Sequence, residues 1–169
     1  MEWKRNNEVI KKPILEYLED LIKEESANGF NLRVFVGTDS QKSSQGGYKF
    51  ATVIILARRQ DLGGGVDVGR GGLVIATTHF HKFKTRNKEA VNERMVYEVG
   101  KSIEVAYEIA PLLDKHEIPL EVHADINPNP MFESNKAMQT AVGYILGMGY
   151  EFKIKPDAWA SSNGADKLC

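Results

Sequence analysis

Apolar residues recur at helical spacing in three long stretches of the chain. In the first, Ile10, Ile14 and Leu18 fall on one stripe, and Asn28-Gly29 follows as a stop signal. In the second, Val91, Met95 and other apolar residues repeat in the same way until Pro111, which we expect to end the helix. The spacing predicts helices over residues 8–25, 87–110 and 134–146, with a last short helix over about residues 158–168.

Short runs rich in β-branched and aromatic residues lie between these stretches. LRVFVG at 32–37 and FATVIILAR at 50–58 are typical of buried strands. Six glycines fall within residues 63–72, which predicts a flexible hairpin connection. The pattern predicts strands over residues 32–37, 50–58, 73–83, 120–124 and 150–154.

The order of these elements indicates the fold class. Three strands joined by short turns predict an antiparallel meander, and the later alternation of helix and strand predicts parallel pairing. We therefore expect an α/β protein with a mixed five-stranded sheet flanked by helices. No linker, repeat or low-complexity tract interrupts the sequence, so we expect one domain over residues 1–169.

Composition and charge exclude several function classes. Lys and Arg number 22 and Asp and Glu 23, so the net charge is -1, and the chain lacks the overall basic field of a non-specific nucleic-acid coat. Cys169 is the one cysteine, too few for an internal disulfide or a multi-cysteine zinc site. No apolar run reaches the roughly 20 residues of a membrane helix, and the first ten residues lack a signal-peptide core. We expect a cytoplasmic protein without a membrane partner.

Acidic residues follow three of the predicted strands. Asp39, Asp125 and Asp157 each come directly after or shortly after an apolar strand, where loops of α/β sheets form ligand sites. Clustered carboxylates repel one another unless a cation or a shared proton compensates them. Hard oxygen ligands favour Mg²⁺ or Mn²⁺, which indicates phosphate-ester chemistry. For each acid alone, the competing interpretation is a turn former or a helix N-cap.

Four segments also resemble a known family. They are VGTDSQ at 36–41, RMVYEVGKSIEVA at 94–106, HADIN at 123–127 and IKPDAWASSNGAD at 154–166. In this order they resemble the YkuK-type family of the ribonuclease H-like superfamily, over about residues 8–167. The strand and helix order predicted above agrees with the fold that this resemblance implies.

The resemblance implies roles for particular acids. The first strand of such proteins carries an essential aspartate, here Asp39, and the fourth strand ends in another, here Asp125. The helix after the third strand carries a glutamate, for which Glu98 is the first choice and Glu93 the second. The resemblance thus extends the carboxylate set beyond the strand ends.

The last acid implied by the resemblance has two candidates. Asp166 lies on the predicted final helix after an asparagine, whereas Asp157 follows the fifth strand directly. Asp39, Glu98, Asp125 and Asp166 would hold Mg²⁺ or Mn²⁺, with Asp157 as the alternative to Asp166. Two such ions about 4 Å apart would activate a water and stabilise the leaving 3′-oxygen of a phosphodiester.

Polar and basic residues near these acids are candidates for substrate contacts. Ser40 and Gln41 follow Asp39, and Lys155 precedes Asp157; turn hydrogen bonds and an ion pair with Asp157 are the competing interpretations. Residues 77–86 form a local basic patch with interleaved aromatics, suited either to nucleic acid or to an ordinary half-exposed strand.

Three histidines have both a functional and a structural interpretation. His79 and His81 share one strand face but have no evident third metal ligand. His123 shares its strand face with Asp125, and we expect it to be a packed strand histidine or a partner of that carboxylate.

The sequence therefore predicts a divalent-metal-dependent nuclease, or a related phosphodiester-processing hydrolase, acting on RNA, DNA or a hybrid. The alternatives are a catalytically inactive ribonuclease H-like scaffold that binds other molecules, and a small-molecule phosphohydrolase that uses the same acids.

Overall fold

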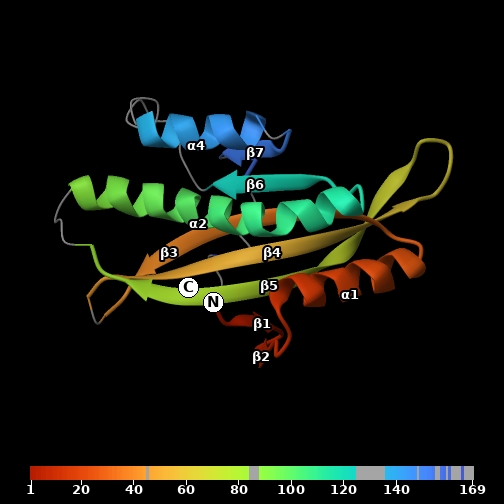
Figure 1. Ribbon diagram of the computed structural model, residues 1–169, viewed down its shortest axis with the longest axis horizontal. Coiled ribbons are helices and arrows are strands. Elements are labelled where there is room, and N and C mark those ends of the chain that lie inside the picture. The colour runs from red at the N-terminus through yellow and green to blue at the C-terminus, as the bar shows by residue number, and fades with distance from the viewer. Residues whose placement is uncertain are drawn as a thin grey trace.

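The computed structural model describes residues 1–44, 46–83, 88–124, 136–147, 149–154, 157–158, 160 and 165. In this part of the chain, helices and strands build one mixed sheet with helices packed against it (Figure 1). The elements are β1 Trp3–Arg5, β2 Glu8–Val9, α1 Ile14–Ala27, β3 Asn31–Lys42, β4 Tyr48–Asp61, β5 Asp67–His81, α2 Lys88–Lys115, β6 Leu120–Ala124, α4 Lys136–Gly147 and β7 Glu151–Ile154.

The sheet has seven strands in the order β2-β1-β5-β4-β3-β6-β7. Strands β3, β4 and β5 form the expected antiparallel meander, and β6 and β7 add to it in parallel. The predicted mixed α/β sheet is confirmed, but the count of five strands is wrong because β1 and β2 extend the sheet beyond β5 (Figure 1).

The two extra strands belong to a short hairpin at the N-terminus. Asn6 and Asn7 have φ values of 52° and 68°, the left-handed conformation that a tight hairpin turn requires and that asparagine tolerates. Trp3 is 6% exposed and pairs with Thr77 of β5, so burial of one large ring fixes the hairpin on the sheet. The predicted helix over 8–25 accordingly begins later, at Ile14.

Two further boundaries differ from the sequence prediction. The glycine-rich stretch is largely strand, because β5 begins at Asp67 and pairs with the end of β4 across a tight turn at residues 62–66. Pro111 lies inside α2, which continues to Lys115. The proline removes a backbone donor, but Ile109 and Leu113 around it are fully buried, and their packing offsets that loss. The predicted final helix lies mostly outside the described residues.

Alternate residues of the central strands face two different environments. Helices α1 and α2 cover one face of the sheet (Figure 1), and the main core forms there between their apolar stripes and residues such as Val34, Val36 and Ile54. On the opposite face, a smaller cluster joins Phe35 and Val53 to Ala160, Ala165 and other small residues. Below, these are called the helix face and the open face of the sheet.

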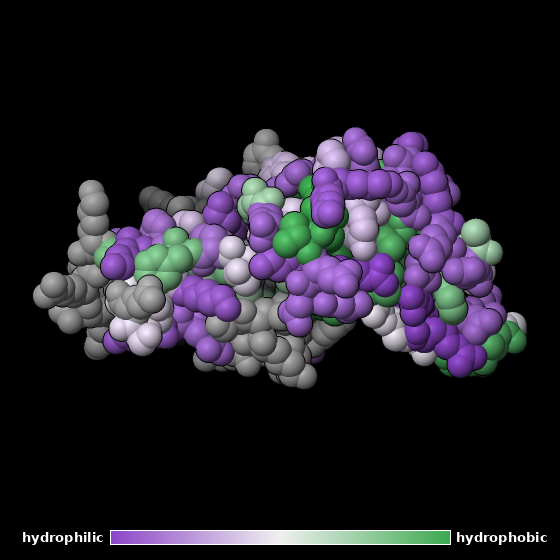
Figure 2. All heavy atoms as spheres, turned by 90° about the horizontal axis from the view of Figure 1, so that it is seen from below, coloured by the Kyte–Doolittle hydropathy of each residue, from purple (hydrophilic) through white to green (hydrophobic). Residues whose placement is uncertain are grey.

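Hydrophilic residues dominate the surface seen in Figure 2, where apolar residues occupy small separate areas. Within the described residues, no helix is long and apolar enough to cross a membrane.

Candidate carboxylate site

Asp39 lies near the C-terminal end of β3, and its side chain is half buried. Its two neighbours point to the helix face, where Thr38 contacts Ser102 and Ser40 contacts Glu98, both from α2. Because successive side chains of a strand alternate, Asp39 belongs to the open face, in register with Ala51 of β4. The candidate acid is therefore presented on the side of the sheet that α1 and α2 leave uncovered.

The parallel pairing of β3 with β6 relates Asp39 to a second acid. The register runs from Val34–Leu120 to Thr38–Ala124, where β6 ends. The next residue in the sequence after Thr38 is Asp39, and the next after Ala124 is Asp125. Asp125 itself lies outside the described residues, as do Asp166 and Lys155.

Asp157 is the one acid of the C-terminal segment that the structure describes. It is exposed, and its backbone N–H donates to the carbonyl of Ile154, the last residue of β7, over 2.9 Å. Since β7 pairs in parallel with β6, Asp157 follows the strand next to the one that precedes Asp125.

Glu98 is 5% exposed and lies on α2 against β3. The hydroxyl of Ser40 donates to its Oε1 over 2.5 Å, and Nε of Arg94 lies 3.6 Å from the same oxygen. Glu93, the second choice from sequence, is exposed on the same helix. The structure thus places Glu98, rather than Glu93, within hydrogen-bond distance of the residue next to Asp39.

Hydroxyl groups fix this part of β3 against its neighbours. Ser102 Oγ lies 2.9 Å from Thr38 Oγ1 and 3.2 Å from the carbonyl oxygen of Glu98. Thr38 Oγ1 lies 2.9 Å from Thr52 Oγ1 on β4. All these side chains are buried, so their hydrogen bonds replace those lost to water and hold the backbone around Asp39 in one position. Sequence reasoning missed this network, because nothing local pairs residues 38, 52 and 102.

The two residues predicted to contact substrate differ in position. Ser40 is 6% exposed, and its hydroxyl donates a hydrogen bond to Glu98. Gln41 is exposed on the open face, one row beyond Asp39 and in register with Lys49 of β4. Gln41 is therefore the one of the two that solvent reaches next to Asp39.

Residues 77–83 of the basic and aromatic patch predicted at 77–86 divide between the two faces of the sheet, and residues 84–86 lie outside the described part of the chain. His79 and His81 turn to the helix face, where His81 stacks on Tyr97 at 4.6 Å and His79 stacks on Phe50 at 5.3 Å. Burial, followed by the positive charge of Lys101, lowers the pKa of His79. These rings form a small aromatic cluster under α2, so both histidines have a packing role here.

His123 ties the C-terminal segment to β6. Its Nδ1 accepts the backbone N–H of Ala160 over 3.1 Å, so Nε2 carries the proton and points to Glu121 Oε2 at 3.4 Å. The imidazole is 1% exposed, and burial lowers its pKa although Glu121 acts in the opposite direction. The neutral ring therefore anchors the chain three residues after Asp157.

The oxygen ligands that a hard divalent cation prefers occur at two strand ends. Carboxylate and amide oxygens occur at the ends of β3 and β7, and the described histidines of this region are engaged in ring or backbone contacts. Within the described side chains, no group of three His, Cys, Asp or Glu residues is arranged as a metal site.

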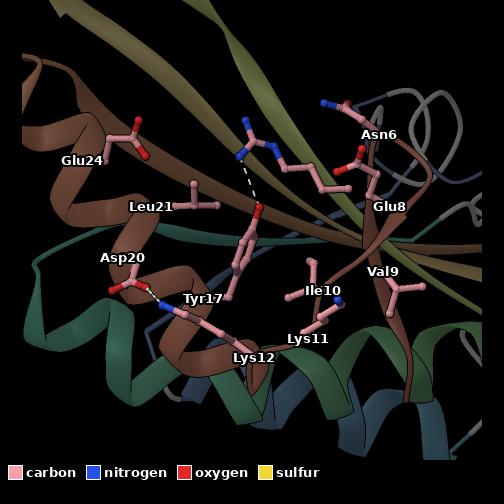
Figure 3. A pocket seen from close by; sticks show the side chains of 11 residues that line it. Asn6, Glu8, Val9, Ile10, Lys11, Lys12, Tyr17, Asp20, Leu21 and Glu24 are labelled. Carbon is pink, nitrogen blue, oxygen red and sulfur yellow. Dashed lines mark hydrogen bonds and ion pairs between the residues drawn. The ribbon is translucent and has the colours of Figure 1, made fainter.

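A separate pocket lies away from Asp39. It has a volume of about 480 Å³ and opens between the N-terminal hairpin and α1 (Figure 3). Arg5 donates to the Tyr17 hydroxyl over 3.3 Å, and Lys12 pairs with Asp20 at 2.6 Å. None of the described candidate acids Asp39, Glu98 and Asp157 lines this pocket, and its cationic and anionic side chains largely compensate one another.

Comparison with known proteins supplies a family. The model of the family described as ribonuclease H-like matches residues 13–169. No curated protein and no solved structure gives a significant match.

Proposed function

Because this chain belongs to the ribonuclease H-like family, we propose that it is a divalent-metal-dependent nuclease or a related phosphodiester-processing enzyme. One observation carries the proposal. The parallel register of β3 and β6 pairs Thr38 with Ala124 at the end of β6, and an aspartate follows each of them in the sequence. Two acids that follow paired residues of adjacent parallel strands are suited to share one cation.

Asp39 and Asp125 would hold Mg²⁺ or Mn²⁺ as the central pair. The C-terminal segment would contribute a third carboxylate, from Asp166 or from Asp157. The His123–Ala160 hydrogen bond supports this part of the proposal, because it fastens that segment to the strand that precedes Asp125. Oxygen-only ligation of this kind suits Mg²⁺ or Mn²⁺ better than a softer metal.

Glu98 has a different place in the proposal. Its Oε1 already accepts the Ser40 hydroxyl, and the Ser40 and Asp39 side chains leave β3 on opposite faces. We assign Glu98 first to positioning: it holds the β3 segment that presents Asp39. A direct metal contact through its other carboxylate oxygen is the alternative. Glu98→Gln should leave Mn²⁺ binding nearly unchanged if Glu98 positions β3, and should weaken it if Glu98 is a metal ligand.

The bound cation would supply a nucleophilic water and stabilise the leaving oxygen of a phosphodiester. The chain itself would contribute orientation. Asp39 would be held still by its buried hydroxyl-bonded neighbours, Gln41 is exposed beside it as a donor to a phosphate oxygen, and Lys155 is the cation proposed for a second phosphate contact.

A cleavage assay tests the proposal. The purified protein is incubated with labelled single-stranded DNA, single-stranded RNA, an RNA–DNA hybrid and a phosphomonoester, with Mn²⁺, with Mg²⁺ or with EDTA. We expect Mn²⁺- or Mg²⁺-dependent cleavage of a nucleic acid that Asp39→Asn abolishes, while Asp61→Asn in the distant β4–β5 hairpin retains it.

The other outcomes identify the competing functions. Hydrolysis of the phosphomonoester alone would indicate a small-molecule phosphohydrolase. Absence of any metal-dependent hydrolysis, together with no Mn²⁺ binding, would indicate an inactive scaffold and would refute the proposal.

A further inference from the structure

The face of the sheet that carries Asp39 also carries a strip of lysines around an exposed aromatic ring. Residues paired across neighbouring strands place their side chains on the same face of the sheet and form a row. Three such rows cross the open face. Asp39 and Ala51 align with Thr78, and Gln41 and Lys49 align with Phe80. The third row, from Val53 through Ala76, ends at Lys4 of β1.

We call Lys4, Lys49, Thr78, Phe80 and Lys82 the open-face strip. Adjacent strands lie about 4.8 Å apart, so the strip begins one strand from Asp39 and reaches Lys4 about 14 Å away across the sheet. A hollow of about 330 Å³ opens along it, lined by Lys4, Lys49, Thr78 and neighbouring side chains. In the register of the sheet, the strip therefore begins next to Asp39, and it is hollowed between Lys49 and Lys4.

Phe80 ends the row that Gln41 and Lys49 begin, and its ring is unusually exposed for an aromatic residue of a strand. It is 47% exposed, whereas Phe50 on the opposite face of the next strand is completely buried. The ammonium group of Lys82 lies 5.7 Å from the centre of its ring. A half-exposed ring with an adjacent cation offers one base a surface for stacking and its phosphate an ion pair.

The charges of the strip favour an anionic partner. Lys4 pairs with Glu2 at 3.3 Å, and Lys49 lies one row from Asp39, so the three lysines of the strip outnumber these two acids. A second copy of this chain seated on the strip would bring like charges together, whereas a phosphate backbone would complement them. The bases of a duplex are already stacked on one another, so a ring that needs a free base face selects an unpaired strand.

We propose that the open-face strip binds single-stranded nucleic acid, with one base stacked on Phe80 and phosphates at Lys49 and Lys82, and that it leads the strand to Asp39. This inference rests on the proposed function for its direction toward Asp39. It also goes beyond that function, because it names the strand state of the substrate and the residues that read it.

Binding is measured without cleavage, by fluorescence anisotropy of a short labelled oligothymidine in EDTA. Stacking on one aromatic ring corresponds to about a 5-fold to 100-fold difference in affinity. We expect Phe80→Ala and Phe80→Leu to weaken binding at least about fivefold and Phe80→Tyr to restore it. Tyr107→Ala, at an exposed aromatic residue of α2, is the matched control and should bind as the unaltered protein does.

A second readout follows the charge. Lys49→Gln keeps most of the side chain and removes one phosphate contact, so the slope of log affinity against log salt should become shallower by about 0.7. A duplex of the same sequence should bind more weakly and respond little to Phe80→Leu. Thermal melting of each variant checks that the fold is retained.

Three results would overturn the inference: Phe80 variants that bind within twofold of the unaltered protein, a duplex that is equally sensitive to them, or a Phe80 variant that changes the sedimentation coefficient through self-association. Because no metal is present, the outcome is separate from that of the cleavage assay. Phe80-dependent binding without hydrolysis would refute the proposed enzyme alone, and hydrolysis without such binding would refute the strip alone.

Discussion

Glu98 provides a sharp test of how Asp39 is held in place. Replacing Glu98 with alanine removes the acceptor of the Ser40 hydroxyl inside the protein and the partner of Arg94. A hydrogen bond to a charged group contributes about 1.5–3 kcal/mol, and the partly exposed Arg94 pair about 0.2–1 kcal/mol. The expected loss in the free energy of unfolding is therefore about 2–4 kcal/mol.

Glu98→Gln separates the hydrogen bond from the charge. The amide oxygen still accepts from Ser40, so we expect a loss of about 1 kcal/mol. For a chain of this length, 1 kcal/mol changes the melting temperature by about 2–4 °C, so the alanine variant should melt about 4–16 °C lower and the glutamine variant a few degrees lower.

Differential scanning calorimetry measures both variants against Glu104→Gln, which removes an exposed carboxylate from the same helix and its pair with Lys101. This control should remain within about 2 °C of the unaltered protein. If Glu98→Ala melted like the control, or if Glu98→Gln lost as much stability as Glu98→Ala, the positioning role would be refuted.

Two further predictions concern buried charges and stability. Because the pKa of His123 is lowered, the unfolded chain binds more protons below the ordinary value of 6.5, so the free energy of unfolding should be constant above that pH and fall below it. Glutamine cannot take up the proton that would compete with the Ala160 N–H for Nδ1 of His123. Denaturant titrations of His123→Gln should therefore show a free energy of unfolding that depends less on pH. An unchanged pH dependence would contradict the lowered pKa of His123. Arg58 donates two hydrogen bonds to Glu25, which is 4% exposed. In urea unfolding, Glu25→Ala should lower the free energy of unfolding by about 2–3 kcal/mol, which is less than for a fully buried ion pair because Arg58 is partly exposed. Asp20→Ala, which breaks an exposed ion pair with Lys12, should lower it by under about 1 kcal/mol.

Strong local patterns predicted the central elements of the fold. The apolar runs of β3, β4 and β6 were found because strands buried on both faces read as continuous hydrophobic sequence. The N-terminal hairpin was missed because three residues are too few to show alternation, and its stability comes from one tryptophan packed at a distance. The glycines at 63–65 form the predicted hairpin connection, whereas Pro111 and the glycines at 69, 71 and 72 were misinterpreted because tertiary burial and sheet pairing outweigh local propensity.

The sequence proposes acids for the candidate site, but it does not reveal which face of the sheet each residue of β3 occupies. Thr38, Asp39, Ser40 and Gln41 are all polar, so the sequence does not reveal which of them points toward the helices. The contacts with Ser102 and Glu98 settle that question, because they fix Thr38 and Ser40 on the helix face. The same alternation divides residues 77–83 into a partly buried aromatic cluster and the exposed strip, which the composition of the patch alone does not reveal.

The location of a bound cation tests the central claim most directly. A crystal soaked in Mn²⁺ and measured at a wavelength where manganese scatters anomalously shows which side chains coordinate the ion. The account predicts a peak within about 2.5 Å of carboxylate oxygens of both Asp39 and Asp125, with a third acid from the C-terminal segment. A peak bound by other residues, or an Asp39 carboxylate too far from Asp125 for one ion to touch both, would contradict it.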